Sequence, residues 1–459
     1  MEQIPAGGRG GEALKGQRLS DVNGRWGSDS VQDATLSVVG GLVGGVLAAA
    51  FVVAFTTLIK ENLAWVLSQD NWIMLLAPFI GIAVAVLLLN LVARGQALQQ
   101  VDGSKTPPRK FSSWLQFPAN AVRADLTSDV VDNAGSEEKF PWRFAPIRAA
   151  AIFATVGMGA PMGTESPAAH LGVAAGSALG SLGQRWRSLA RSAGVGGGAA
   201  GVAALMGLPL VGLAFMLELG RRNHAPLNLS RVLAAASGAF IGWGVNVGLD
   251  LDLIRLIVPN IPPGDLLRAL ATAALVGALS GVLGSVTGSA IYQARGWSAS
   301  PTVKFATGGA LLLICLLAIS SLATPAAAIG PGAGAVTWAE SSSATFWVLL
   351  AVVVLRALAT TAAVMAGGCG GLFVPLLAIG DLSGRALAPI LGVSGELAAA
   401  AGAAGSIAGG YRLPLTAIAM VLTVGGPISA RLTCVAAVAF ATAAGIAVSY
   451  LLDRYVLHR

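Results

Sequence analysis

Two short segments of the chain combine glycine and proline at a spacing that suits the start of a helix. Gly-Thr-Glu-Ser-Pro stands at 163–167 and Gly-Leu-Phe-Val-Pro at 371–375, so a proline follows a glycine by four residues in both. The first turn of a helix leaves backbone N–H groups unpaired and carries a partial positive charge, and both features bind anions. The residues expected to present such N–H groups are Thr164, Glu165, Ser166, Leu372 and Phe373.

Glu165 stands at the mouth of the first of these helices, and its chemistry is the most informative in the chain. We expect Ser166 to cap that helix and Pro167 to open it, with the helix running through Leu179. A carboxylate is itself an anion, so Glu165 can occupy the helix-end site and must leave or be protonated before a free anion enters. The alternative is an acid that only stabilises the helix dipole. His170 lies on a different face and is expected to be packed.

The two segments belong to a longer internal repeat. When Gly163 is aligned with Gly371, Gly172 aligns with Gly380 and Leu179 aligns with Leu387. A Leu-Pro-Leu string then follows each segment, at 208–210 and at 413–415. Two prolines that recur with nearly equal spacing predict a duplication, with halves at roughly 34–225 and 226–455. Repeats of this kind, often inverted in the membrane, place the substrate near the bilayer midplane on helix ends.

The composition indicates the elements that must hold these segments. Of the 459 residues, 55% are hydrophobic and 11% are charged, and the mean hydropathy is +0.74. Soluble proteins carry about 25% charged residues, so we expect a polytopic protein of the inner or plasma membrane, not a soluble enzyme. The net charge of +7 falls in short runs such as 185–191 and 221–222, typical of cytoplasmic loop ends and not of a nucleic-acid surface. Three isolated cysteines and three histidines predict no metal site and no cofactor.

Apolar segments alternate with breaks along the chain. A span needs about 20 apolar residues, and long candidates lie at 34–58, 73–92, 229–247, 267–291, 305–322, 346–365 and 432–452. Shorter pieces broken by Gly and Pro lie at 147–163, 166–182, 194–219, 372–391 and 414–424. We expect a cytoplasmic tail at 1–33, a transmembrane domain at 34–455, a polar loop at 94–143, and no soluble C-terminal regulatory domain.

These strings resemble the motifs of the CLC family of chloride channels and proton-coupled anion exchangers. The string around Glu165 is similar to the family's Gly-Lys/Arg-Glu-Gly-Pro motif, and 371–375 is similar to its Gly-x-Phe-x-Pro motif. The stretch 208–218, which ends at Glu218, resembles a third. The resemblance implies an all-α polytopic fold with an inverted repeat of tilted and broken helices, a homodimer, and one pore per subunit. It also implies that Glu165 gates the pore and that N–H groups near Glu165, Leu372 and Phe373 contact the anion.

The chain departs from the family pattern at several positions. Thr164 replaces the family's basic residue and Ser166 its second glycine, and Leu219 stands where exchangers commonly carry an internal proton-transfer glutamate. The family's early anion-binding serine has its nearest counterpart in Ser104. Its pore tyrosine has two candidates, Tyr450 and Tyr455.

The preferred hypothesis is therefore transport of small anions, chloride first, through a pore gated by Glu165. The alternative is a proton-coupled antiporter, including fluoride/proton exchange, that moves protons on Glu165 alone. A membrane-embedded enzyme would need a cluster of His, Asp or Ser groups, and a cation-coupled transporter would need several acids within the membrane. The sequence favours neither, because the candidate acids Glu165, Glu218 and Asp381 are far apart.

Overall fold

The fold is built from helices that fall into two successive sets along the chain. A computed structural model describes residues 31–101, 126–249, 251, 259, 261–424 and 431–457. The tail expected at 1–33 therefore lies almost wholly outside the described residues, as do 102–125 of the expected polar loop. Within the described ranges the regular structure is helical, apart from one isolated bridge between Gly163 and Gly371.

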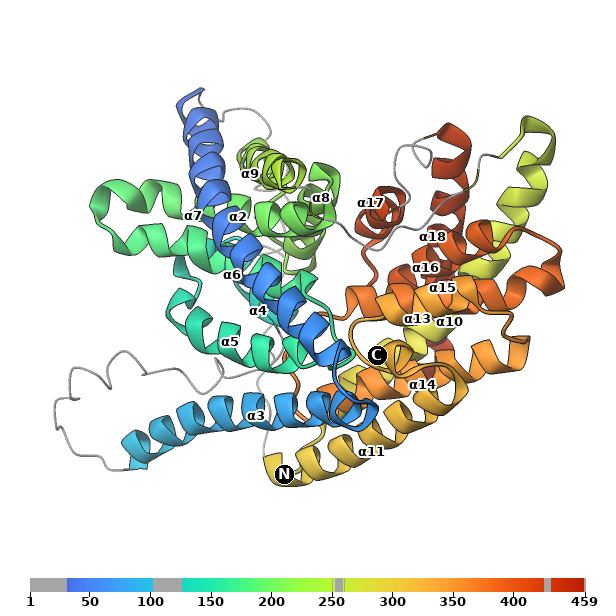
Figure 1. The fold of residues 1–459 in the computed structure, drawn as a ribbon. Coiled ribbons are helices and arrows are strands. Elements are labelled where there is room, and N and C mark those ends of the chain that lie inside the picture. Colours follow the sequence, from blue (N-terminus) through green and yellow to red (C-terminus); the bar gives the residue numbers. More distant parts are fainter. Residues whose placement is uncertain are drawn as a thin grey trace, which may run out of the picture.

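The first set comprises α2 to α9, which lie together in the blue-to-green part of the ribbon (Figure 1). Their bounds are α2 Val31–Leu67, α3 Asn71–Val101, α4 Leu126–Asp132, α5 Ala145–Ile152, α6 Glu165–Ala178, α7 Gln184–Met206, α8 Pro209–Arg222 and α9 Leu229–Gly248. Two short 3-10 turns, η3 (Glu137–Lys139) and η4 (Trp142–Phe144), precede α5, and a π-helical turn, η5 (Phe153–Gly157), continues it.

The second set comprises α10 to α18, drawn in yellow to red in Figure 1. Their bounds are α10 Leu266–Gly296, α11 Pro301–Leu322, α12 Pro325–Ala328, α13 Ala333–Ser341, α14 Phe346–Met365, α15 Phe373–Leu391, α16 Gly395–Tyr411, α17 Pro414–Val424 and α18 Leu432–Leu452. A π-helical turn, η9 (Asp453–Leu457), follows α18.

One glycine contact between the broken helix and its neighbour recurs in both sets, as the predicted repeat requires. In the first set Gly172 of α6 packs against Gly197 of α7, so closely that a Cβ on Gly172 would lie 2.7 Å from the Gly197 carbonyl carbon. In the second set Gly380 of α15 packs against Gly402 of α16, and the matching distance is 2.6 Å. Small residues let membrane helices approach this closely. The duplicated glycines therefore hold each broken helix against its neighbour.

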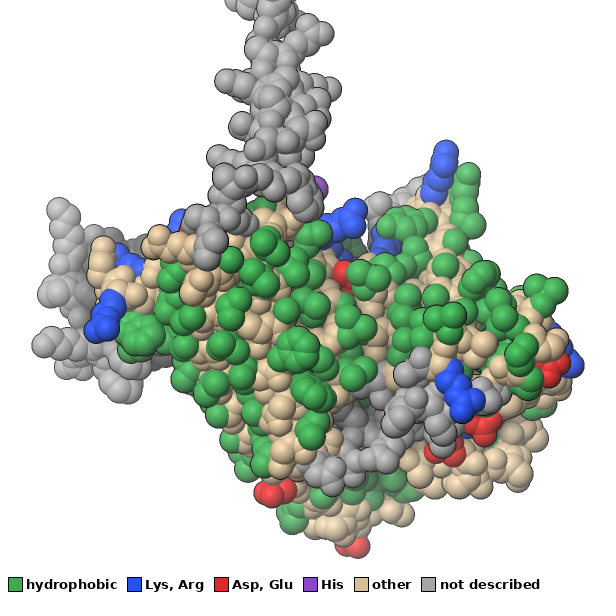
Figure 2. All heavy atoms as spheres, turned by 90° about the horizontal axis from the view of Figure 1, so that it is seen from above, with side chains coloured by type: hydrophobic (Ala, Val, Ile, Leu, Met, Phe, Trp, Pro, Cys, Tyr) green, Lys and Arg blue, Asp and Glu red, His purple; other side chains and the backbone are tan. Residues whose placement is uncertain are grey.

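The outer surface suits a bilayer. Within the described residues, seven helices are long and apolar enough to cross a membrane: α2, α3, α10, α11, α14, α15 and α18. Hydrophobic side chains cover much of the face drawn in Figure 2, and charged side chains are sparse among them. Because a bilayer solvates apolar surface, this exterior is that of a multi-pass membrane protein.

Three details differ from the sequence-based expectation. The piece expected at 194–219 is two helices, because Gly207 adopts a left-handed φ of 70° and Pro209 opens the next helix. The expected loop at 94–143 contains the end of α3 and the short α4 (Leu126–Asp132). The segment 372–391, expected to be a short interrupted piece, forms the 19-residue helix α15.

Candidate functional site

The starts of the two broken helices meet. Gly163 and Gly371 form an isolated antiparallel bridge in which each N–H donates to the other's carbonyl oxygen at 2.7 Å. α6 begins two residues after Gly163, and α15 begins two residues after Gly371. The helix starts are therefore joined through their backbones, and the expectation that the two segments converge on a common point is confirmed.

The Glu165 carboxyl group lies against this bridge. A Cβ on Gly371 would come within 2.9 Å of Glu165 Oε2, and one on Gly163 would overlap the carboxyl group. The backbone N–H groups of Thr164, Glu165 and Val374 are directed at the carboxyl group. The residue is 4% exposed, and Oε2 has no hydrogen-bond partner among the described residues. A carboxyl group thus already lies close to the amides of two helix starts, which is the geometry of an anion site.

The first of these helices starts differently from the expectation. We expected Ser166 to be the N-cap, but the N-cap residue is Thr164, whose side chain makes no capping hydrogen bond, and the helix begins at Glu165. The Ser166 hydroxyl instead accepts a hydrogen bond from Thr127 Oγ1 of α4 at 2.9 Å. A tertiary contact to α4 therefore takes the place of the local cap.

A small cavity adjoins Glu165 on one side. Its volume is about 50 Å³, and it is lined by Thr56, Thr57 and Lys60 of α2, Thr164, Glu165, Leu205 and Met206 of α7, and Leu251. Lys60, an exposed residue, is the cation among these lining residues. We call this space the Glu165 cavity.

A larger cavity reaches the start of α15 from another direction. Its volume is about 270 Å³, and its lining residues are Thr127, Ser128, Val131, Arg222, Gly288, Ile291, Tyr292, Arg295, Leu372, Leu376, Gly410 and Tyr411. None of these lining residues is acidic, whereas two are arginines and several carry hydroxyl groups. We call this space the Leu372 cavity.

An aromatic cluster borders the Leu372 cavity. The Phe373 ring stacks on Tyr411 with ring centroids 4.0 Å apart, and it meets Phe215 edge-on at 5.3 Å. Phe373 and Phe215 are each 1% exposed, and Tyr411 is 8% exposed. Since these rings come from α15, α16 and α8, the cluster fixes the start of α15 against both halves of the repeat.

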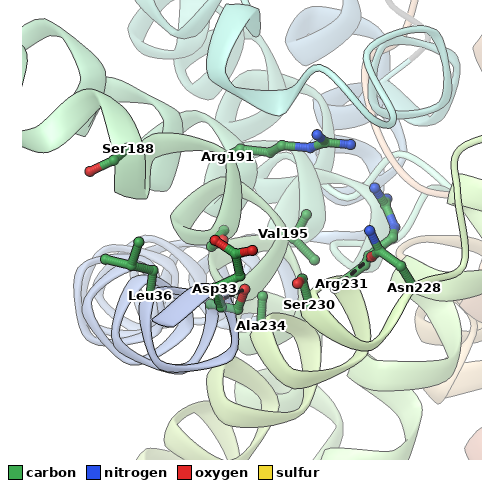
Figure 3. A pocket seen from close by; sticks show the side chains of 11 residues that line it. Asp33, Leu36, Ser188, Arg191, Val195, Asn228, Ser230, Arg231 and Ala234 are labelled. Atoms are coloured by element: carbon green, nitrogen blue, oxygen red, sulfur yellow. Dashed lines mark hydrogen bonds between the residues drawn. The ribbon is translucent and has the colours of Figure 1, made fainter. Parts of the chain in front are cut away.

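The two cavities lie toward opposite ends of α2. Figure 3 shows Asp33, at the start of α2, in a polar pocket with Arg191 of α7 and Arg231 of α9. Arg231 in turn packs on Gly220 of α8, two residues from Arg222, which lines the Leu372 cavity. Lys60, in the Glu165 cavity, follows Asp33 by 27 residues of the same helix, or about 40 Å at 1.5 Å per residue.

The other candidate residues are placed as follows. Ser104 lies outside the described residues. Tyr450 and Tyr455 are 59% and 66% exposed, with the guanidinium groups of Arg412 and Arg454 over their rings, and neither lines the two cavities described above. Two other tyrosines line the Leu372 cavity, Tyr292 of α10 and Tyr411 at the end of α16. We did not single out either in the sequence, because nothing in their local patterns marks them.

The remaining ionisable residues have structural partners. His170 is fully buried, with Nε2 3.4 Å from Arg148 Nη1 and its ring edge-on to Phe140, as expected for a packed histidine. Arg148 also pairs with Asp129 of α4. Asp381 accepts a hydrogen bond from Arg385 Nε at 2.8 Å.

Glu218 links the two halves of the molecule. Its carboxylate accepts hydrogen bonds from the backbone N–H groups of Leu415 and Thr416 at 2.8 and 2.9 Å, and from Thr416 Oγ1 at 2.6 Å. These groups belong to the first turn of α17. Glu218 therefore caps a helix of the second half from the end of α8.

Comparison with curated proteins finds bacterial relatives of modest identity. The chain is 28% identical over 293 residues to the H(+)/Cl(-) exchange transporter ClcA of Cronobacter sakazakii, a match that covers 61% of this chain and 62% of that protein. It is 26% identical over 300 residues to the protein of the same name from Citrobacter koseri, covering 61% of each. The chain thus matches about three-fifths of the length of these relatives.

Solved structures share the fold over nearly the whole chain. The structure of a slow cyanobacterial Cl-/H+ antiporter superposes with a TM-score of 0.63 at 24% identity, covering 94% of this chain and 99% of that one. A CLC-type fluoride/proton antiporter gives the same TM-score at 20% identity, covering 93% and 98%. Residues 111–446 match the family model described as voltage gated chloride channel. Because that match takes in well over half of the sequence, the chain belongs to the CLC family of voltage-gated chloride channels.

Proposed function

We propose that this protein carries small anions, chloride first, across the inner or plasma membrane through a path that Glu165 gates. The observation that carries the proposal is the position of the Glu165 carboxyl group, buried on the Gly163–Gly371 bridge beneath the amides of two helix starts. An anion that passes this point must take the place of the carboxylate, because both need the same N–H groups.

The path runs from the Leu372 cavity, past Leu372 and the bridge, to the Glu165 cavity. Arg222 and Arg295 attract anions to one end and Lys60 to the other. At the centre, partial charges of backbone amides replace full cationic side chains. Binding is then strong enough to strip water from the ion and weak enough to release it.

Glu165 acts as the gate through its charge. While ionised, it competes with the anion for the helix-start amides. Once protonated or swung away, it leaves those amides to the anion. Thr164 and Ser166 flank it, and their backbone N–H groups, with those of Leu372 and Phe373, are the proposed anion contacts.

The experiment is anion flux from proteoliposomes that contain purified protein. Glu165→Gln carries no charge and mimics the protonated side chain, so its flux is expected to differ from wild type and to lose its pH dependence. The matched control is Glu396→Gln, which changes an exposed acid in the first turn of α16. Glu165 is not the gate if its variant keeps the wild-type rate and pH profile.

A second candidate is proton-coupled exchange, in which Glu165 carries one proton for the anions it admits. It is supported by the curated relatives, which are named H(+)/Cl(-) exchange transporters. Leu219 stands where a second proton-transfer acid would be, so Glu165 would act without it. The reversal potential under combined anion and pH gradients separates the two. A reversal potential that equals the Nernst potential of the anion and does not change with pH indicates a channel. A reversal potential that shifts with pH indicates exchange. Chloride and fluoride are tested in parallel.

The proposed orientation places the start of α2 and the Leu372 cavity in the cytoplasm. Arg191 and Arg231 lie at this end (Figure 3), and Arg222 lines the Leu372 cavity; basic residues are enriched on the cytoplasmic side of membrane proteins. We also propose a homodimer through the neighbouring helices α8, α9 and α17 (Figure 1), which expose Leu210, Phe240 and Leu415. Cysteine crosslinking at Phe240 in native membranes tests both the assembly and the face used.

A further inference from the structure

An apolar groove runs beside the helix that begins with Glu165. Its volume is about 490 Å³, and its walls are α2, the turn η4 with the start of α5, and α6, which neighbour one another in Figure 1. Its lining residues are Phe51, Trp142, Arg143, Ala145, Pro146, Ile147, Leu171, Ala174, Ala175 and Ala178. Nine of these ten are hydrophobic, and Phe51 is 45% exposed. The groove thus opens on the surface that faces the bilayer.

One wall of the groove is a single stripe of α6. Leu171, Ala174, Ala175 and Ala178 follow the spacing of three and four residues that places side chains on one face of a helix. Leu171 and Ala174 are buried, whereas Ala175 and Ala178 are half-buried, so a molecule seated here would touch α6 along its last turn.

Among the described residues that line the groove, Arg143 alone is charged, and it is exposed. Its guanidinium carbon lies 5.5 Å from the centroid of the Trp142 ring, in cation–π geometry. A tryptophan beside an arginine is typical of the membrane–water boundary. An exposed arginine next to hydrocarbon is unfavourable unless it reaches water or an anionic group. The rim therefore presents a cation directly above an apolar slot.

We propose that this groove is a binding site for an anionic phospholipid. An acyl chain lies in the slot against Ala175 and Ala178, and the headgroup phosphate pairs with Arg143. The combination of an apolar slot and one rim cation matches a lipid, whose charge and chain are joined in one molecule. The lipid braces α6 from outside. This inference does not depend on the proposed anion transport.

The test compares lipid retention by native mass spectrometry of the purified full-length chain in detergent. Phosphatidylglycerol and phosphatidylcholine with identical acyl chains are titrated separately. Wild type is expected to retain phosphatidylglycerol about tenfold better, a preference that Arg143→Gln removes. Ala175→Phe, which fills the slot, is expected to weaken retention of both lipids. Phosphatidylglycerol is also expected to raise the unfolding temperature of wild type but not of Arg143→Gln.

Two control variants separate this site from general lipid adhesion. Arg187→Gln removes an exposed arginine elsewhere, and Ala439→Phe adds bulk to a half-buried alanine of α18; both are expected to retain lipid as wild type does. Equal retention of the two lipids by wild type, or an unchanged preference in Arg143→Gln, would overturn the proposal. Because retention is measured without transport, a chain that carries no anion but still prefers phosphatidylglycerol would refute only the proposed function.

Discussion

Gly163 and Gly371 stand 208 positions apart in the sequence, yet their peptide groups bond to each other twice at 2.7 Å, and the Glu165 carboxyl group lies against the pair. One consequence is that the two halves of the repeat cannot move independently at this point. A second is that there is little room at the bridge, since the side chain of Glu165 fills the space that a Cβ at either glycine would need.

Because the bridge leaves little room, a substitution at Gly371 tests whether the Glu165 carboxyl group lies there. In Gly371→Ala the new methyl group would lie 2.9 Å from Glu165 Oε2 and 3.1 Å from the Ser166 nitrogen, so the carboxyl group must shift and the anion position narrows. Overpacking of this kind lowers the free energy of unfolding by about 1–3 kcal/mol. Because the anion position is also narrowed, anion flux in proteoliposomes is expected to fall about tenfold, which corresponds to about 1.4 kcal/mol.

The matched control for that variant is Gly244→Ala in α9, where a Cβ would meet no atom within 4 Å. Its flux is expected to equal that of wild type. A Gly371→Ala protein with wild-type flux would show that the carboxyl group is not held at the bridge.

Local sequence chemistry was sufficient to predict the centre of the site. The glycine and proline at 163–167 and at 371–375 act within one helical turn, so their spacing predicted two helix starts, and the repeat predicted that the starts meet. The same locality explains one error. Ser166 has the right type and position for an N-cap, but its hydroxyl bonds to Thr127, which is 39 residues away.

The surroundings of the site could not be predicted in this way. Lys60, Thr127 and Tyr411 line the two cavities from α2, α4 and α16, and each is an unremarkable residue within its own helix. Their relevance arises only from tertiary packing, which no spacing along the chain encodes. Tyr450 and Tyr455 were candidates because they lie near the end of the chain. Tyr411 instead lines the Leu372 cavity, where its ring stacks on Phe373.

Arg356 is predicted to be a main determinant of stability. It is 1% exposed and donates from Nη1 to the carbonyl of Ala327 at 2.7 Å and from Nη2 to that of Gly330 at 2.8 Å. Arg356→Leu leaves these carbonyls unpaired, so the free energy of unfolding is expected to fall by about 3 kcal/mol. Thermal unfolding in detergent measures the change. Arg356→Lys is expected to recover part of the loss, and equal stability of the leucine variant would contradict the assignment.

Glu218 is predicted to stabilise the fold without taking part in transport. Glu218→Ala removes the acceptor for the first N–H groups of α17, so a loss of about 0.5–2 kcal/mol is expected, as for other N-caps. Reversal potentials of the variant, measured with intact protein, are expected to match those of wild type. A reversal potential that shifts while the unfolding temperature stays constant would instead make Glu218 part of the ion or proton path.

The two arginines of the Leu372 cavity are predicted to set the anion concentration at the proposed cytoplasmic end of the path. Arg222 and Arg295 approach this cavity from α8 and α10, and no acidic residue lines it in the part of the chain that the structure describes. A cleft lined by one sign of charge raises the local concentration of counter-ions by roughly tenfold or more. In Arg222→Gln or Arg295→Gln the half-saturating chloride concentration from this side is expected to rise about threefold or more, because part of that attraction is lost.

The measurement is the initial flux over a range of chloride concentrations. Gluconate holds the ionic strength constant, because added salt would screen the charge of the arginines, with a Debye length of about 10 Å at 0.1 M. Arg187→Gln, an exposed cation at the start of α7, is the control and is expected to leave the half-saturating concentration unchanged. The maximal rate is expected to stay within about twofold of wild type in every variant. The substitution weakens binding of the ion equally in the bound state and in the transition state, so only the half-saturating concentration changes. A reduced maximal rate with unchanged saturation would mean that the arginines act on the narrow part of the path instead of its entrance.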